Sequence, residues 1–189
     1  MVVAGQAAHW FDYPKLWPEM ARVVRQGGTI AFWGYGDCVF PGYPAASKIL
    51  RRYAYGDSPE LLGPYWSRPG RDIVENKLRD IVPPEGEWED VKRVEYEPAA
   101  SEPGMGEGTM YLQRKMEISA VGDYVRTWSA YHGWKEAHPE AERRGVGKGT
   151  GDIVDRLLDE IKAEVKEWKA PETRVVVEWA SGLLMAKRR

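Results

Sequence analysis

The residue best placed to do chemistry is a histidine near the start of the chain. His9 and Trp10 follow segment 2–8, which has the small, apolar composition of a buried strand. Ligands of open α/β sheets bind at the carboxyl ends of strands, so we expect both side chains to line a pocket. An imidazole can act as acid or base near neutral pH, which makes His9 the candidate catalytic residue and Trp10 a substrate-binding residue. The alternative is a structural histidine bonded to a neighbouring carbonyl.

Two aromatic residues end the next predicted strand. The chain has 9 Trp and 10 Tyr against 3 Phe, and the two abundant types join an apolar ring to a polar tip that suits pockets. Trp33 and Tyr35 close the apolar segment 29–35. Parallel pairing of this strand with segment 2–8 would bring them to the same edge as His9, so we expect them to bind substrate. Packing in the core is the alternative.

Two further segments carry candidate substrate-binding residues. Trp66, Arg68 and Arg71 lie in the run Trp-Ser-Arg-Pro-Gly-Arg over 66–71, and of the two arginines we select Arg68 as the substrate-binding residue. A guanidinium beside aromatic rings suits a substrate carboxylate or enolate, because it forms bidentate hydrogen bonds. Trp128 and Tyr131 share one side of a predicted helix over 121–131. A surface arginine and core tryptophans are the alternatives.

The elements that must position these residues begin with a strand, a helix and a strand. Apolar residues spaced for one helix face predict a helix from about residue 16, which Gly27 and Gly28 end. Such a unit implies parallel strands with a right-handed crossover. Sequence patterns predict further strands over 88–97, 109–119 and 173–186, and further helices over 47–55, 71–81 and 152–168.

Several of these segments resemble one known family. Segments 2–12 and 19–32, the run 66–71 and the motif Arg-Thr-Trp-Ser-Ala-Tyr-His at 126–132 are similar to the second half of class I S-adenosylmethionine-dependent methyltransferases. The resemblance is to their small-molecule, secondary-metabolite type, which includes the trans-aconitate methyltransferases. It implies an α/β, truncated Rossmann-like fold with a parallel βαβ unit, antiparallel closing strands and a helical cap. We expect one domain over 1–189, with cap elements from 36–90 and 105–170, and His9 and Trp10 in the pocket.

The resemblance also implies that two parts of the family's cofactor site are absent. The family's glycine-rich loop and its acidic ribose-binding residue precede the segments matched here. We therefore expect no cofactor, and a cofactor-independent isomerase, cyclase or lyase that uses the aromatic pocket. One alternative is an S-adenosylmethionine-dependent methyltransferase completed by dimerisation or by a partner subunit. The other is a non-catalytic regulatory or binding subunit.

The expected partners follow from the strand at 2–8 and from composition. As an edge strand it would expose unpaired backbone groups, so we expect residues 2–12 to lie in a homodimer interface or against a partner chain. The net charge of −2 argues against nucleic acid and membrane partners, and the single cysteine fits a cytoplasmic protein. The glycine-rich segment 145–151 lacks phosphate-loop spacing, and no Cys/His cluster predicts a metal.

Overall fold

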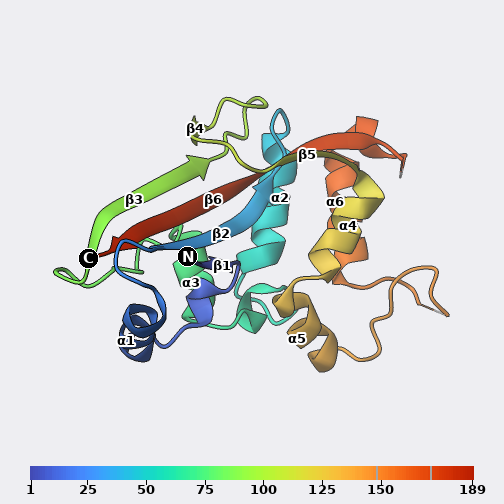
Figure 1. The fold of residues 1–189 in the computed structure, drawn as a ribbon. Helices are drawn as coiled ribbons and strands as arrows, with labels where there is room; N and C mark the ends of the chain where they lie inside the picture. Colours follow the sequence, from blue (N-terminus) through green and yellow to red (C-terminus); the bar gives the residue numbers. More distant parts are fainter. Residues whose placement is uncertain (148, 171) are drawn as a thin grey trace.

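The strands form one mixed sheet in the computed structural model, which describes residues 1–147, 149–170 and 172–189. Within these residues the sheet has six strands in the order β1-β2-β6-β3-β4, and β5 also pairs with β6 (Figure 1). The strands are β1 (Val2–Gly5), β2 (Thr29–Val39), β3 (Trp88–Glu97), β4 (Glu107–Gly108), β5 (Gln113–Glu117) and β6 (Arg174–Arg188). The helices are α1 (Tyr13–Val23), α2 (Pro44–Tyr55), α3 (Gly70–Glu75), α4 (Ile118–Arg126), α5 (Ser129–Ala137) and α6 (Ile153–Glu164).

The first three elements form the predicted parallel unit. β1 pairs in parallel with β2, from Val2 opposite Ile30 to Gly5 opposite Trp33. α1 begins at Tyr13, earlier than the pattern predicts, because Pro14 lies in its first turn, where a missing N–H costs nothing. Gly27, at φ 71°, then supplies the left-handed turn that leads into β2.

The closing strands are antiparallel, as the resemblance implies. β6 lies between β2 and β3 and pairs antiparallel with both. Its first residues also pair with β5, on the side that β3 occupies further along the strand. The predicted α/β arrangement of a parallel unit with antiparallel closing strands is therefore confirmed, with the last strand inserted between two earlier ones.

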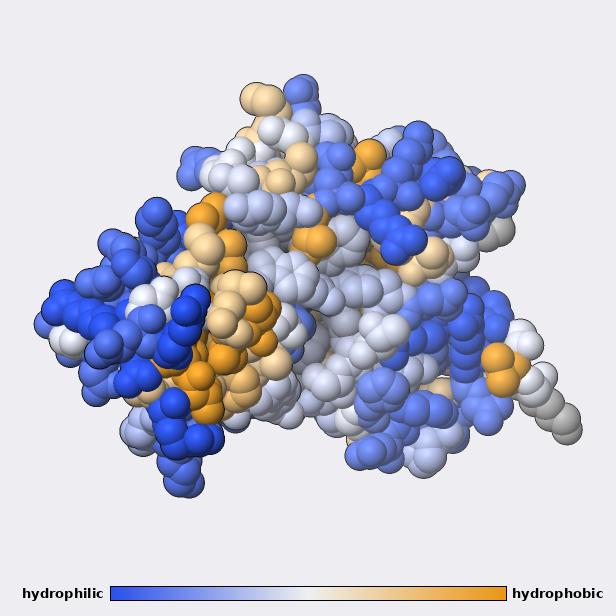
Figure 2. Space-filling model, viewed as in Figure 1, coloured by the Kyte–Doolittle hydropathy of each residue, from blue (hydrophilic) through white to orange (hydrophobic). Residues whose placement is uncertain are grey.

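One prediction about β1 is wrong. The strand ends at Gly5, not Ala8, and it is not buried on both faces, since Val3 is 60% exposed. β1 is the edge strand of the sheet and pairs only with β2 among the described residues. Figure 2 shows an apolar patch around this end of the chain, where Met1 and Val3 are exposed.

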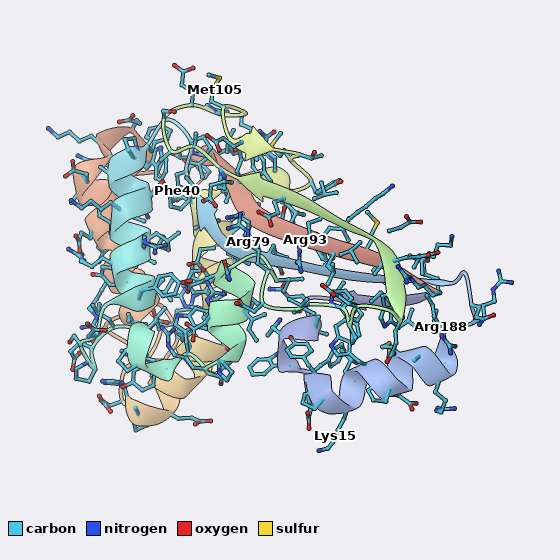
Figure 3. All side chains as sticks on the ribbon, turned by 90° about the vertical axis from the view of Figure 1, so that its left-hand side faces the viewer. Lys15, Phe40, Arg79, Arg93, Met105 and Arg188 are labelled. Atoms are coloured by element: carbon cyan, nitrogen blue, oxygen red, sulfur yellow. The ribbon has the colours of Figure 1, made fainter. Side chains whose placement is uncertain are left out.

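Two predicted helices are shorter than expected. The helix over 71–81 ends at Glu75, because Lys77 and Leu78 adopt left-handed conformations with φ of 54° and 62°. Arg93 on β3 donates to the carbonyl oxygens of Leu78 (3.0 Å) and Ile81 (2.6 Å), which ties this turn to the sheet (Figure 3). The helix over 121–131 is in fact two helices, α4 and α5, separated at Thr127 and Trp128.

The core has two clusters. One lies between the sheet and α1 and includes Trp17, Phe32 and Trp88. The other lies among α2, α4, α5 and α6 and contains Phe40, labelled in Figure 3, together with four buried tryptophans, Trp128, Trp134, Trp168 and Trp179. Lys148 of the glycine-rich segment lies outside the described residues. Among those residues, no helix combines the length and the apolar character needed to cross a bilayer.

Candidate functional site

A cavity of about 280 Å³, the first cavity, lies at the carboxyl end of β1, beside Tyr35 and Gly36 of β2; β2 does not end at Tyr35 as predicted but continues to Val39. Its walls come from four parts of the chain: Gln6, His9 and Trp10 after β1, Tyr35 and Gly36 on β2, the segment that enters α3, and the junction of α4 with α5. The parallel pairing of β1 with β2 brings residues near positions 6 and 35 together, and residues from 66–74 and 124–129 complete the wall. This is the position at which open α/β sheets bind ligands.

Gln6 sets the direction of the chain after β1. Its φ of 51° turns the backbone away from the sheet. Its side-chain carboxamide accepts from the Tyr35 N–H (2.8 Å) and donates to the Tyr35 carbonyl (2.9 Å). The Gln6 side chain thus extends the hydrogen bonding between β1 and β2 by one residue, in place of backbone groups. The following turn (Ala8–Trp10) places His9 at the cavity.

His9 is held as a neutral imidazole with one unused nitrogen. Burial, and then the positive charge of Arg71, lower the pKa of His9 below its usual value. Its Nδ1 is buried and has no hydrogen-bond partner among the described residues. The structural reading, a histidine satisfied by a neighbouring carbonyl, would require a partner for this atom. A neutral ring with a free nitrogen can accept a proton.

Arg71 is the arginine that lines the cavity. Its guanidinium lies 4.1 Å from the ring centroid of Trp66, which places the charge over an aromatic face. It is also paired with Asp37 and lies 3.4 Å from Glu75, while its Nε donates to the Tyr55 hydroxyl (2.9 Å). Burial disfavours the charged form, but Asp37 and Tyr55 outweigh it and raise the pKa of Arg71. Two carboxylates therefore already balance its charge.

Five of the eight predicted site residues meet at the first cavity: His9, Trp10, Tyr35, Trp66 and Trp128. The other three lie elsewhere. Arg68 pairs with Asp72 and its side chain is 54% exposed, so the predicted arginine is three residues away from the one that lines the cavity. Trp33 lines a second cavity, and Tyr131 donates to Asp152 (2.8 Å).

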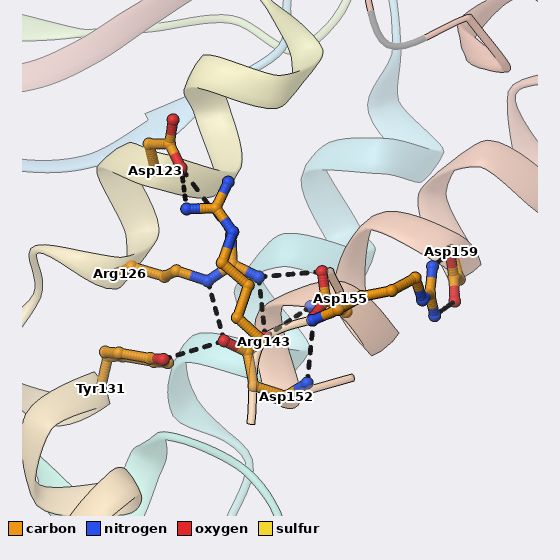
Figure 4. A network of polar contacts seen from close by, with 8 residues as sticks. Asp123, Arg126, Tyr131, Arg143, Asp152, Asp155 and Asp159 are labelled. Atoms are coloured by element: carbon orange, nitrogen blue, oxygen red, sulfur yellow. Dashed lines mark hydrogen bonds and ion pairs between the residues drawn. The ribbon is translucent and has the colours of Figure 1, made fainter. Parts of the chain in front are cut away.

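Tyr131 belongs to a polar network that joins α4, α5 and α6 (Figure 4). Asp152 caps α6 by accepting from the Asp155 N–H (2.8 Å), and Arg126 forms two hydrogen bonds of 2.8 Å with its carboxylate. The direct bond of Tyr131 to the completely buried Asp152 places this tyrosine in a structural contact, away from the first cavity.

The lining residues of the first cavity that sequence reasoning did not select include Gln6, Tyr124 and Thr127. For Gln6 no local signal existed, because its role depends on a hydrogen bond to a residue 29 positions later. Tyr124 lies four positions before Trp128 in the sequence, so the spacing of the predicted helix could have identified it. Its hydroxyl accepts from the Trp179 Nε1 (2.9 Å), and burial raises its pKa.

The second cavity, of about 800 Å³, adjoins the first. Tyr35, Tyr124 and Thr127 line both cavities, so they form the shared wall. The described residues hold no group of three or more His, Cys, Asp and Glu side chains that could bind a metal ion.

Comparison with known proteins places this architecture beside methyltransferases. No model of a known protein family matches the chain. It is 26% identical over its whole length to the "probable S-adenosylmethionine-dependent methyltransferase CRG1" of Saccharomyces cerevisiae, covering 62% of that protein. It is 25% identical over its whole length to a "putative methyltransferase" of Dictyostelium discoideum, covering 59% of it.

A solved structure shares the fold. It is titled as a "putative type II methyltransferase" from Anaeromyxobacter dehalogenans, with a TM-score of 0.63 and 24% identity over 98% of this chain and 63% of that one. The chain thus spans about three fifths of the relatives it matches. Its resemblance to S-adenosylmethionine-dependent methyltransferases is confirmed along its full length, and its fold is a methyltransferase-like α/β fold.

Proposed function

We propose that this chain forms the acceptor-binding part of an S-adenosylmethionine-dependent methyltransferase that acts on a small molecule. The observation that carries the proposal is the first cavity, which lies at the carboxyl end of β1 in a methyltransferase-like fold and is lined by aromatic rings around one unpartnered imidazole. Its volume of about 280 Å³ is close to the lower end of small-molecule sites, which span roughly 300–1,000 Å³. The names of the relatives favour methyl transfer over the cofactor-independent reaction expected from the sequence.

The acceptor that fits is planar and uncharged. The rings of Trp10, Tyr35, Trp66 and Trp128 can stack against a flat molecule. The sequence predicts an arginine that binds a carboxylate or enolate. The arginine at the first cavity is Arg71 rather than Arg68, and Asp37 and Glu75 already balance its positive charge. A substrate carboxylate would have to compete with both acids, so we propose a neutral phenol or amine.

His9 would take the proton that such an acceptor loses. The lowered pKa of His9 favours the neutral ring, and this residue lines the first cavity. Gln6 and the backbone turn after it hold the ring in place. S-adenosylmethionine supplies an electrophilic methyl group when it is bound.

The residues of this chain do not by themselves fit that cofactor. The first cavity is lined by no aspartate or glutamate among the described residues, so it offers no carboxylate for ribose hydroxyls. No glycine-rich loop follows β1, where Gln6 and Ala7 lead directly into the turn that carries His9. We therefore propose that the cofactor is bound by residues equivalent to the part of the relatives that this chain does not match.

The edge of β1 is the proposed junction with those residues. The outer edge of this strand has no pairing strand in the described chain, and Met1 and Val3 expose apolar surface beside it. Another strand can add there by backbone hydrogen bonds. We propose that residues 2–12 pair with a partner segment that carries the cofactor site; a second copy of this chain is the competing partner.

The test titrates the chain with S-adenosylhomocysteine and with acceptor probes, and determines its mass in solution. We expect weak or no cofactor binding by the chain alone. Catechol should perturb the indole NMR signals of Trp66 and Trp128, whereas 4-hydroxybenzoate should do so at least about five-fold more weakly, because Asp37 and Glu75 beside Arg71 oppose a third carboxylate.

Three results would contradict this proposal. Micromolar cofactor binding by the chain alone would place the whole site within one chain or a homodimer. Chemical conversion of a probe without S-adenosylmethionine would restore the cofactor-independent reading. Equal binding of catechol and 4-hydroxybenzoate would remove the assigned role of the Arg71 cluster. Adding a separately expressed cofactor-binding segment should yield trideuteromethylated product from labelled S-adenosylmethionine, and His9→Gln should reduce it.

A further inference from the structure

The second cavity is larger than the first and has a different chemistry. Its volume of about 800 Å³ falls within the range of small-molecule sites. Trp33 and Tyr35 on β2, together with Trp179 on β6, give it an aromatic wall, and Leu112 and Met116 add aliphatic surface. A flat or elongated apolar group would therefore leave water on entering it.

The rim of this cavity is cationic. Arg114 and Lys115 on β5 and Arg174 on β6 all line it and are exposed. None of the three lies within ion-pairing distance of a carboxylate among the described residues, although the Arg174 guanidinium donates to the Lys115 carbonyl (3.2 Å). In contrast to Arg71, these three cations have no ion pair with a carboxylate among the described residues, although Arg174 lies opposite Glu117 in the register of β5 with β6.

The acids at the rim offset only a small part of this charge. Asp123 lies at the cavity, but Arg143 binds its carboxylate at 2.8 Å. Glu117 is the other acidic lining residue among those described. The described lining of the second cavity thus contains three cations and one carboxylate without an ion pair, together with aromatic side chains, which is an electrostatic match for an anion.

We propose that the second cavity binds an amphiphilic organic anion, a molecule with an apolar ring or chain and a carboxylate, sulfonate or phosphate at one end. The apolar part lies against Trp33 and Trp179, and the anionic end lies at Arg114, Lys115 and Arg174. The site is separate from the acceptor site at the first cavity, and binding there does not depend on methyl transfer.

The shared wall gives such a ligand a route to influence the first cavity. Tyr35 and Tyr124 line both cavities, and the Tyr124 hydroxyl accepts from the indole of Trp179 on the second-cavity side. A ligand against Trp179 therefore contacts the group that holds Tyr124 in place. Catechol binding at the first cavity should change when the second cavity is filled.

The test is a fluorescence titration of the full chain with two probes that share one ring system. 8-Anilinonaphthalene-1-sulfonate carries an anion, and N-phenyl-1-naphthylamine does not. We expect the sulfonate to bind with one-to-one stoichiometry and about ten-fold more tightly than the neutral probe, since each exposed cation contributes a factor of about two to three.

Two variants separate the cavity from other apolar surface, such as the edge of β1. Arg114→Glu/Lys115→Glu should weaken sulfonate binding at least about ten-fold and change neutral-probe binding less than two-fold. Arg25→Glu/Lys166→Glu makes the same change in net charge at exposed positions that do not line the cavity, and should change neither. Ala120→Trp fills the cavity without altering charge and should abolish binding of both probes.

Each opposite result overturns the proposal. Equal affinity for the two probes, or unchanged sulfonate binding in Arg114→Glu/Lys115→Glu, would remove the role of the rim. Unchanged binding of both probes to Ala120→Trp would place them elsewhere on the molecule. Absence of saturable binding would show that the cavity is not a ligand site. Circular-dichroism melting of each variant confirms that it is folded.

Discussion

Arg71 and Arg126 have almost the same partners at two different places in the molecule. Arg71 contacts Asp37, Glu75 and the hydroxyl of Tyr55, whereas Arg126 contacts Asp152, Asp155 and, through Asp152, the hydroxyl of Tyr131. The Arg126 cluster joins three helices, while the Arg71 guanidinium also lies over Trp66 and faces the first cavity. Residue types therefore do not distinguish a structural cluster from a site cluster; contact with a cavity does.

The largest effect should come from removing the structural arginine. Arg126→Ala leaves the completely buried Asp152 carboxylate without its cation, which typically costs about 3–5 kcal/mol of the free energy of unfolding. Urea unfolding measures the loss. Arg143→Ala removes an exposed arginine from the edge of the same network and should cost less than about 1 kcal/mol. Equal losses would show that Asp152 does not depend on Arg126.

The corresponding change at the cavity should be milder for stability and stronger for binding. Arg71→Leu keeps apolar contact with Trp66, but leaves Asp37, which is 18% exposed, without its cation, so we expect a loss of about 1–3 kcal/mol. Catechol affinity should fall because the Trp66 ring loses the guanidinium that lies over its face. If catechol affinity is unchanged while stability falls, the Arg71 cluster is structural like the other one.

A pair of tyrosine variants compares the two clusters more finely. Tyr131→Phe removes the hydrogen bond to Asp152, at a cost of about 1 kcal/mol, and should leave catechol binding unchanged. Tyr55→Phe removes the acceptor for the Arg71 Nε at a similar cost, and should alter catechol binding as well. Chemical denaturation and ligand titration of both variants give the four values. A change in the catechol affinity of Tyr131→Phe would show that the Arg126 cluster also affects binding at the first cavity.

The smallest effect is a pH dependence that only the cavity should show. The pKa of His9 is lowered in the folded chain, so the unfolded chain binds more protons as pH falls below about 6.5. The contribution of neutral His9 to the free energy of unfolding is therefore fully present above that pH. It is lost as the pH falls toward the pKa of His9 in the folded chain. His9→Gln should flatten this part of the profile. Arg71→Leu should raise the pKa of His9 in an NMR titration, because it removes a positive charge, whereas Arg126→Ala should not.

Much of the fold was predictable because it depends on local patterns. The strands β1 and β2, with α1 and the glycines between them, follow from apolar spacing and turn residues close in sequence. The break between α4 and α5 was not predictable in this way, since the residues around Thr127 continue the apolar spacing of a single helix. The turn that ends α3 depends on Arg93 of β3. This side chain can donate hydrogen bonds to the carbonyl oxygens of Leu78 and Ile81 only after the chain has folded.

The candidate site was predictable to the extent that strand pairing determines it. His9 and Tyr35 could be placed together because β1 and β2 pair in parallel, although β2 continues beyond Tyr35 to Val39. Trp33 and Tyr35 lie two residues apart on the same strand, yet Trp33 lines only the second cavity, because α4 and β5 set the boundary between the cavities. The choice between Arg68 and Arg71 depended on Asp37 and Tyr55, which are distant in sequence.

The amino-acid sequence by itself determined the order of the elements, the parallel unit and the resemblance to methyltransferases, since short-range periodicity and turn chemistry specify them. The tertiary structure alone decided that Arg71 is the arginine at the first cavity and that Asp37 and Glu75 balance its charge. It also decided that Tyr131 has a structural role. Those properties depend on contacts between segments tens of residues apart, and on burial, which strengthens a charge pair only after the surrounding side chains have excluded water.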